Sequence, residues 1–392
     1  MRPPVVRLAT RLFAPEVGAA AFRERLLADA FAAAGWRVEV VTTLPPAGAP
    51  TPDDGPLRVS RWPVLRDEGG NIRGYVQYLS YDLPLLARLL LARRADLYVA
   101  EPPPTTGVVV RLAAALRRRP YIWYAADVWS DAAAISGAPA PVLWALRAVE
   151  RWVLRGAALV LSVSDGVTDR CVELGVSRDR AVTVGNGVDT AVFRPDGDAE
   201  PAATPYFVYT GTMSEWQDAS VFVRALRRHH DAGGTERLVF LGQGSDLPAL
   251  RTLAEQLVPG LVDFPGVVPP ADAARWLRGA TAALVSIKPG QGYDFAKPTK
   301  IYAATGCGTP VVFAGRGAGA ELVGTAGLGW AVEHDEAAVA AAMAEAVAAA
   351  GADEPERVAR RERLAAWTVE HASSAALARR AADECIARLG RA

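Results

Sequence analysis

Short apolar runs alternate along this chain with longer stretches in which apolar residues recur every three or four positions. At the start, apolar runs at residues 5–10 and 38–43 enclose a stretch with helical spacing at residues 19–34. Buried strands of parallel sheets are continuous apolar runs, whereas helices that cover a sheet repeat with a period of 3.6 residues. The chain therefore begins as strand, loop, helix and strand, which predicts a doubly wound α/β domain.

The same alternation starts again after residues 191–205, a segment rich in Pro, Asp and Ala that is typical of a linker. Strands are expected next at residues 206–210, 237–241 and 282–285, with helices between them. A chain of 392 residues is long enough for two cores. We therefore expect two Rossmann-like domains, at residues 1–190 and 191–370, and a terminal helical segment at residues 371–392.

Candidate chemistry in the first half lies where predicted strands end, because such sheets bind ligands beyond the carboxyl ends of their strands. Asp127 follows the apolar run at residues 120–124. A carboxylate there suits the binding of sugar hydroxyls or proton transfer, and it equally suits a turn or the N-cap of the next helix. The other residues expected at this edge are Gly18, Glu101, Thr105 and Thr106.

In the second half, a glycine- and lysine-bearing loop joins the apolar run at residues 282–285 to a helix that Pro298 opens. Proline suits the first turn of a helix, and the N–H groups of Thr299, Lys300 and Ile301 would then point outward. Free amides, the helix dipole and the ammonium groups of Lys297 and Lys300 would form an anion site. A capped helix with two solvated lysines is the alternative. The second half thus offers Gly211, Lys297, Lys300 and Glu321 to a ligand.

Composition narrows the possible functions. The chain has 43 basic and 43 acidic residues, and this balance argues against a nucleic-acid partner bound through phosphate neutralisation. Its three cysteines lie far apart and its four histidines form no metal-ligand pattern, so we predict no metal centre and a reducing, cytoplasmic setting.

The sequence gives only a weak indication that this protein contacts a membrane. No apolar run approaches the roughly 20 residues that span a bilayer. Arg88, Arg93 and Arg94 lie near the end of a predicted helix at residues 75–94, where basic side chains complement the helix dipole. We prefer this interpretation, with weak peripheral membrane contact as the alternative.

Several short motifs occur in a fixed order. They are GNGVDTAVFRP at 185–195, YTGTMS at 209–214, LVFLGQGSDLPAL at 238–250, VDFPGVVP at 262–269, PTKIYAATGCGTPVV at 298–312 and AELV at 320–323. Together they resemble the retaining glycosyltransferases of family four, which have the GT-B fold and use nucleotide-activated sugars. The N-terminal stretch at residues 14–43 resembles that family's glycine loop and first helix, so the resemblance covers nearly the whole chain.

The resemblance implies a transferase that moves a sugar from a nucleoside diphosphate to a small-molecule or lipid-linked acceptor with retention. The nucleotide sugar is a substrate, and no cofactor is expected. The terminal helix at residues 371–392 would return to the first domain. Catalytic roles would belong to Asp127, Lys300 and Lys297. Donor-binding residues would be Gly18, Gly211, Thr212, Gly242, Gly244, Asp294, Phe295, Ala296, Pro298, Thr299, Tyr302 and Glu321. Acceptor-binding residues would be Glu16, Asn71, Tyr75, Glu101, Thr105 and Thr106.

The sequence also departs from the family's pattern. Phe295 and Ala303 occupy the positions of a glutamate pair, the second of which holds the nucleotide ribose. The basic residue expected after the glycine loop has no clear match at residues 214–220, and Ala125 and Ala126 stand where a histidine is common near Asp127. Two alternatives therefore stay open: a catalytically inactive member that binds nucleotide sugars or a partner, and a hydrolysing sugar-nucleotide epimerase of similar build.

Overall fold

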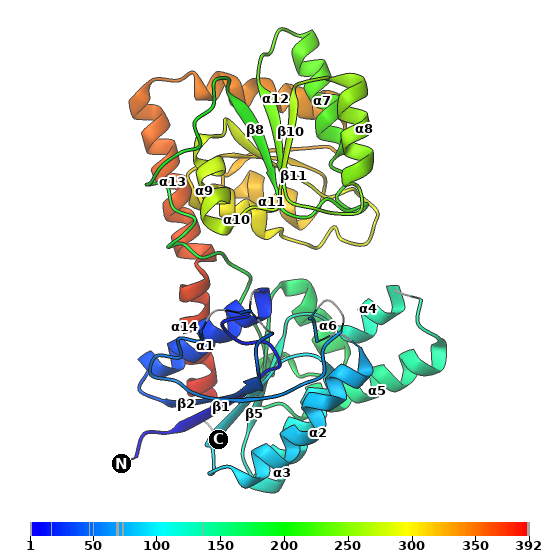
Figure 1. Cartoon of the computed structure of the whole chain (residues 1–392), viewed down its shortest axis with the longest axis vertical. Helices are drawn as coiled ribbons and strands as arrows, with labels where there is room; N and C mark the ends of the chain where they lie inside the picture. Colours follow the sequence, from blue (N-terminus) through cyan, green and yellow to red (C-terminus); the bar gives the residue numbers. More distant parts are fainter. Residues whose placement is uncertain are drawn as a thin grey trace. The chain divides into compact units, whose positions relative to one another are not determined.

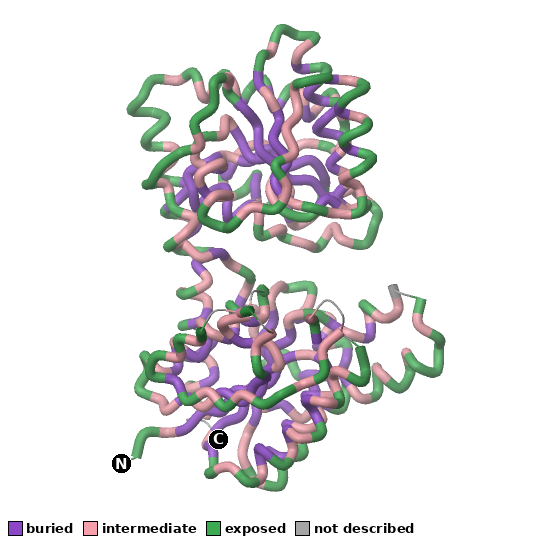
Figure 2. The backbone as a smooth tube through the Cα atoms, viewed as in Figure 1, coloured by how far each residue is buried: buried purple, intermediate pink, exposed green. Residues whose placement is uncertain are grey.

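The computed structural model describes residues 2–16, 18–46, 48–49, 51–67, 70–72, 74–135 and 137–389. The chain forms two compact units, shown in Figure 1: Met1–Asn186 with Ser374–Ala392, and Gly187–Ser373. Each unit is a parallel sheet with helices on both faces, and Figure 2 shows the strands as its buried centre. The expected pair of Rossmann-like domains is thereby confirmed.

The sheet of the first unit has its strands in the order β3-β2-β1-β4-β5-β6-β7, all parallel. The order reverses between β1 and β4, which is where ligands bind in doubly wound sheets. Thr10 and Glu101 directly follow these two strands. The strands are β1 (Val5–Ala9), β2 (Arg37–Thr43), β3 (Arg58–Trp62), β4 (Leu97–Ala100), β5 (Tyr121–Ala125), β6 (Leu159–Ser162) and β7 (Ala181–Thr183).

Two separate apolar cores cover the faces of this sheet. On one face, Leu27 and Phe31 of α1 (Ala19–Ala33) pack with Ala381 and Cys385 of α14 (Ser374–Leu389). The other face carries the remaining helices, and all of them except the short helix at residues 129–135 contribute apolar residues to the second core. They are α2 (Tyr75–Leu91), α3 (Pro104–Arg117), α4 (Trp129–Ile135), α5 (Ala140–Gly156) and α6 (Asp165–Glu173), followed by the 3-10 turn η1 (Arg178–Arg180).

The sheet of the second unit has the order β10-β9-β8-β11-β12-β13 and is also parallel. Its reversal point lies between β8 and β11. The strands are β8 (Tyr206–Thr210), β9 (Arg237–Leu241), β10 (Val262–Gly266), β11 (Ala282–Ser286), β12 (Val311–Ala314) and β13 (Gly329–Val332). The helices are α7 (Ser220–Asp231), α8 (Leu247–Leu257), α9 (Pro270–Gly279), α10 (Thr299–Gly306), α11 (Ala318–Thr325), α12 (Glu336–Ala350) and α13 (Glu354–Ala372).

Three local predictions were wrong or incomplete. β3 had not been expected, because it is an edge strand in which no residue is fully buried and the sequence RVSRW has no apolar run. Helix α3 begins at Pro104 rather than at residue 108, since proline fits the first turn. Ser164, not Asp165, caps α6, because its hydroxyl accepts a hydrogen bond from the Val167 N–H.

The expected linker at residues 191–205 is not a linker, since it lies within the second unit. Its main chain is held by side chains of that unit: Arg278 donates to the Asp198 carbonyl oxygen at 2.8 Å, and Arg361 donates to that of Pro195 at 3.1 Å. Composition could not reveal this, because the partners are backbone carbonyl groups. The chain instead passes between units at residues 186–187 and again at 373–374.

The terminal segment expected at residues 371–392 belongs to the first unit only from Ser374 on, because residues 371–373 lie at the end of α13 in the second unit. Buried alanines and Cys385 of α14 lie against α1, so this helix completes the core on that face of the first sheet. Residues 390–392 of the expected terminal segment lie outside the described residues.

Candidate active site

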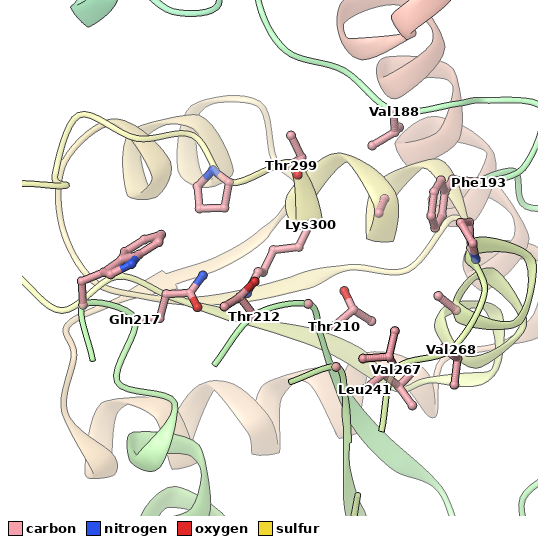
Figure 3. A pocket seen from close by; sticks show the side chains of 17 residues that line it. Val188, Phe193, Thr210, Thr212, Gln217, Leu241, Val267, Val268, Thr299 and Lys300 are labelled. Atoms are coloured by element: carbon pink, nitrogen blue, oxygen red, sulfur yellow. The ribbon is translucent and has the colours of Figure 1, made fainter. Parts of the chain in front are cut away.

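A pocket of about 500 Å³ opens at the carboxyl ends of β8 and β9 in the second unit, within the usual size range of small-ligand sites. Figure 3 shows its walls, which come from these strand ends, the segment after β10 and the start of α10. The sequence-predicted residues that line it are Gly211, Thr212, Gly242, Pro298, Thr299 and Lys300.

Two glycines allow the strand ends to approach each other in this pocket. Gly242 has φ 138°, and a Cβ atom there would lie only 2.0 Å from the Gly211 carbonyl oxygen. Gly211 has φ 104°, and its N–H donates to the Leu241 carbonyl oxygen at 2.7 Å. No other residue tolerates both the left-handed backbone and the close contact at Gly242. The pocket therefore has a wall of bare backbone, which a charged ligand can approach closely.

Lys300 is the charged side chain of the pocket lining. It extends from α10 toward Gln217 and Thr212, as Figure 3 shows. Its Nζ atom lies 3.9 Å from the centre of the Tyr209 ring. With the Gln217 amide turned so that its nitrogen donates to the Thr212 carbonyl group, the amide oxygen accepts from Lys300 Nζ at 3.2 Å. The ammonium group is thus positioned by an aromatic face and a neutral amide.

The protonation of Lys300 is sensitive to a ligand. Burial of the amino group lowers the pKa of Lys300 to about 7, and no neighbouring charge among the described residues offsets this effect. Loss of hydration disfavours the charged form, and an anion entering the pocket would favour it again. An anion that enters the pocket would therefore stabilise the ammonium form of Lys300.

The start of α10 differs from the expected arrangement in one detail. Pro298 is the N-cap and the helix begins at Thr299. The N–H group of Ile301 donates to the Pro298 carbonyl oxygen at 3.0 Å, so it is not available to a ligand as predicted. Thr299 is exposed at the pocket, and the positive end of the helix dipole lies beside Lys300. The start of α10 and the ammonium group of Lys300 together favour an anionic ligand.

Other predicted donor residues do not line the pocket. Lys297 is exposed on the preceding loop, and Glu321 is exposed on α11. Tyr302 is buried and stacks on Trp367 of α13, with ring centres 6.2 Å apart. Gly244 allows its backbone to pack against that of Met213, because a Cβ atom at this position would lie 1.8 Å from the Met213 carbonyl oxygen.

Farther from α10, the loop at residues 293–296 approaches the pocket through a chain of aromatic rings. Trp216, which lines the pocket, stacks on Tyr293 at 4.5 Å, and Tyr293 is followed at 6.5 Å by the ring of Phe295. The main chain of Asp294 accepts from the Ala318 N–H at 2.9 Å, and Ala296 donates to Tyr293. These two residues therefore shape the loop beside the pocket.

Sequence reasoning missed a larger set of lining residues. Some could have been found by position alone, because they directly follow or end strands of a parallel sheet. Others, above all Gln217, are brought to Lys300 only by folding. The missed residues are Val188, Phe193, Thr210, Trp216, Gln217, Leu241, Val267, Val268, Pro270 and Ala273. Ala303, which stands at the ribose-binding glutamate position of the family, also lines the pocket.

In the first unit, Glu101 at the reversal point of the sheet is occupied by internal partners. It is 5% exposed, accepts from Thr10 Oγ1 at 2.7 Å and forms an ion pair with Arg23 at 2.6 Å. The Arg23 guanidinium also lies over the Tyr124 ring at 5.0 Å. This network orders the edge of the sheet where a ligand was expected.

Asp127 is exposed at the carboxyl end of β5. Part of the residue's surface meets solvent, but neighbouring groups displace water from around the carboxyl group, and this loss of hydration raises the pKa of Asp127 to about 6. Arg23 opposes the rise, and Glu150 and Glu101 add to it. Near neutral pH this group can therefore accept or release a proton, as well as bind hydroxyl groups.

The remaining predicted residues of the first unit fall into two groups. Glu16 pairs with Arg66 at 2.8 Å, and Thr106 is buried and donates to Asp82 at 2.7 Å, so both take part in internal contacts. Tyr75 is exposed at the start of α2, and Gly18 precedes α1 with open space around its Cα atom.

Thr105 and Asn71 are the other two residues that the sequence predicted to bind the acceptor. Thr105 is half-buried in the first turn of α3. The Asn71 N–H donates to Asp67 at 2.8 Å. Residues 68, 69 and 73, which are close to Asn71 in the sequence, lie outside the described residues.

No group of three or more His, Cys, Asp or Glu side chains that could hold a metal ion occurs among the described residues. None of the helices in the described ranges is both long and apolar enough to cross a bilayer.

Comparison with protein families identifies both units. Residues 18–187 match the glycosyl transferase 4-like domain, and residues 204–349 match the glycosyl transferases group 1 domain. The chain belongs to the group 1 glycosyltransferases.

Curated proteins with similar sequences are also glycosyltransferases. The chain is 28% identical over 213 residues to the colanic acid biosynthesis glycosyltransferase WcaL of Escherichia coli K12, covering 54% of this chain and 52% of that protein. It spans about half, or somewhat less, of the length of the curated relatives that it matches.

Solved structures show the same fold at low identity. Sucrose-phosphate synthase of Thermosynechococcus elongatus superposes with a TM-score of 0.71 at 17% identity, covering 99% of this chain and 100% of that chain. Anabaena HepE in complex with UDP gives a TM-score of 0.69 at 16% identity, covering 98% and 100%. The GT-B fold that the motifs implied is thereby confirmed.

Proposed function

We propose that this glycosyltransferase moves a sugar from a nucleoside diphosphate to an acceptor, with retention of configuration and without a metal ion. The observation that carries the proposal is the pocket of the second unit, where Lys300, the start of α10 and the bare backbone at Gly211 and Gly242 meet. A diphosphate suits this combination of cation, helix start and close backbone approach. The complex of Anabaena HepE with UDP supports the same ligand class.

Lys300 would act on the leaving group. Negative charge grows on the outer phosphate as the bond to the sugar breaks, so an ammonium group fixed beside it stabilises the transition state more than the ground state. Gln217 and the Tyr209 ring would hold this ammonium in place. Because the pocket lining has Ala303 at the ribose-binding glutamate position, the diphosphate contacts would supply a larger share of donor binding.

In the first unit we propose that the acceptor binds near Asp127 and Tyr75, both of which are exposed at or close to the carboxyl edge of the sheet. Asp127, with its raised pKa, would bind hydroxyl groups or exchange a proton with the acceptor. Glu101 would stabilise this edge of the sheet through its ion pair with Arg23 and the hydrogen bond that it accepts from Thr10. We place the reaction in a reducing, cytoplasmic compartment, where the buried thiols of the three cysteines are stable.

The proposal is tested by incubating the full chain with UDP-, GDP-, ADP- and dTDP-sugars and a panel of small-molecule and lipid-linked acceptors. Acceptor-dependent release of nucleoside diphosphate, with the product anomer assigned by NMR and the rate unchanged by EDTA, is the expected result. Nucleotide binding without release would show the inactive alternative. Sugar isomer and diphosphate formed without an acceptor would show the epimerase.

Donor binding should take up a proton at alkaline pH. With a pKa of about 7, Lys300 is about nine-tenths neutral at pH 8, and a bound diphosphate favours its ammonium form and so raises the pKa. Calorimetric titration with the nucleoside diphosphate in two buffers of different ionisation enthalpy should reveal uptake approaching one proton at pH 8. The uptake should shrink as the pH falls to 7 and below, where the free lysine is already charged.

Lys300→Met is the control for this measurement, because it removes the titrating group and keeps the chain length similar. Buffer-independent heats for the wild-type protein at pH 8 would show that Lys300 does not meet the diphosphate.

A further inference from the structure

Helices α2, α3 and α5 form one layer on the first unit's sheet. Their inner sides share one core, in which Leu85 of α2, Val110 of α3 and Leu154 of α5 are buried. Arg111 of α3 lies over the ring of Trp152 of α5 at 4.0 Å, which joins the two helices at their surface. Figure 1 shows the helices of this layer in blue to green, and Figure 2 shows the exposed outer side of these helices.

The outer side of this layer exposes large apolar side chains that the core does not use. Trp144 of α5 is 75% exposed, and Leu83 and Tyr75 of α2 are 72% and 74% exposed. Exposed apolar residues scattered singly are normal, but here they lie on neighbouring helices of one layer. The full set is Tyr75, Val76, Leu79, Leu83, Leu91, Leu112, Leu116, Val142, Trp144 and Trp152.

The same layer has no exposed acidic side chain. Within residues 74–119 and 140–164, Asp82, Glu101 and Glu150 are buried, and Asp96 is half-buried and pairs with Arg119. Exposed arginines are present instead. They are Arg93, Arg94, Arg118, Arg147, Arg151 and Arg155. The outer side of the layer therefore combines apolar groups with positive charge alone.

α5 shows this combination most clearly. Trp144, Arg147, Arg151 and Arg155 recur at spacings of three and four residues, so they lie along one stripe of the helix, and all four are exposed. Such a stripe differs from an ordinary solvated helix face, on which charges of both signs alternate. The opposite side of the same unit carries charges of both signs. Helix α14 exposes Arg379, Arg380 and Asp383. On α1, the half-buried residues Arg25 and Asp29 form an ion pair at 2.9 Å.

We propose that the outer side of the α2–α3–α5 layer binds the surface of a membrane that contains anionic lipids. Helices that lie at a bilayer surface carry tryptophan and leucine toward the acyl chains and arginine toward the lipid phosphates. A second copy of this chain on the same side would set arginine against arginine, which favours lipid as the occupant. Arg88, considered a membrane-binding residue from the sequence, takes no part, because it is buried and donates to the carbonyl groups of Thr42 and Ser60.

This proposal does not depend on the identity of the donor or the acceptor. Tyr75 is the one residue of this surface that is also a proposed acceptor contact, and the variants below leave it unchanged. It concerns a surface of the first unit, whereas the nucleotide pocket lies in the second. Its consequence for function would be a protein held at the membrane surface, where lipid-linked acceptors are found.

The test is sedimentation of the full chain with vesicles at low salt. Vesicles of phosphatidylglycerol and phosphatidylcholine in a one-to-two ratio should carry the protein down, and pure phosphatidylcholine should retain much less of it. The double variant Arg147→Glu with Arg151→Glu should bind at least about tenfold more weakly, since each basic residue near an anionic surface contributes about fivefold to affinity. The matched control, Arg379→Glu with Arg380→Glu on α14, makes the same change in net charge and should bind as the wild type does.

The apolar part of the surface is tested separately. Brominated lipids should quench the fluorescence of Trp144, and Trp144→Phe should lose that share of the quenching. Trp144→Ser should weaken binding while the thermal unfolding midpoint stays unchanged, because the side chain is exposed. Equal loss of binding in both arginine double variants would overturn the proposal, as would failure of the wild type to bind anionic vesicles. Dimerisation without lipid that Trp144→Ser abolishes would assign the surface to a second copy and also overturn it.

Discussion

Replacing Lys300 by alanine should lower kcat by roughly a hundredfold at saturating donor. Removal of a fixed charge contact to a developing anion typically costs about 3 kcal/mol of barrier. The structure makes Lys300 the natural source of that charge, since its ammonium lies between the Tyr209 ring, Gln217 and the backbone of Gly211 at the pocket. Steady-state release of nucleoside diphosphate is the measurement.

Two substitutions separate this role from a general effect of charge. Lys300→Arg should recover the rate only in part, because the longer, forked guanidinium cannot occupy the same place between ring and amide. Lys297→Ala removes an equal charge from an exposed position outside the pocket lining and should change kcat little. Wild-type turnover by Lys300→Ala would show that the diphosphate is held elsewhere.

The stability of the Lys300 variants should move in the opposite direction from their activity. Folding lowers the pKa of Lys300 from 10.5 to about 7, so the folded state disfavours its ammonium form. This cost is fully present below pH 7 and fades as the pH rises toward 10.5. Lys300→Met should therefore unfold at the same temperature as the wild type or a higher one at pH 7. A loss of rate in such a variant cannot come from unfolding.

Replacing Glu101 by alanine should lower the free energy of unfolding of the first unit by about 3 kcal/mol. Removing one partner of a buried ion pair leaves the other charge uncompensated, and this usually costs more than the pair itself contributes. Here Arg23 would remain beside Tyr124 without its carboxylate, and the Thr10 hydroxyl would keep only the Leu12 carbonyl group as its acceptor. Urea unfolding, followed by hydrogen exchange at β1 and β4, measures the change.

The double variant Glu101→Leu with Arg23→Met is the control for Glu101. Because both charges are gone, it should lose less stability than Glu101→Ala alone. Glu101 was a candidate acceptor-binding residue on sequence grounds, and the same variants decide this point. Wild-type stability of Glu101→Ala, together with a specific rise in the KM of the acceptor, would make Glu101 a ligand-binding residue instead.

Local sequence was sufficient for the architecture. Most strands of both sheets are apolar runs that a parallel sheet buries, the exceptions being β3, β7, β10 and β13, in which no residue is fully buried. The order of the strands with the intervening helices predicts two doubly wound units. The same reasoning places ligands at strand ends, and Gly211, Gly242 and Lys300 do line a pocket there. These features are determined by hydrophobic periodicity and by glycine, which act within a few residues.

Tertiary structure alone decided which polar groups face a ligand and which serve the fold. Glu101 and Thr106 follow strand β4 as candidates should, yet Arg23 and Asp82, from distant helices, engage them inside the first unit. Gln217 meets Lys300 because β8 and α10 converge at the pocket, although neither segment signals the other in sequence. Desolvation and pairing depend on atoms brought together from remote parts of the chain, and for this reason the lowered pKa of Lys300 and the acid-free outer side of α2, α3 and α5 emerge only from the folded structure.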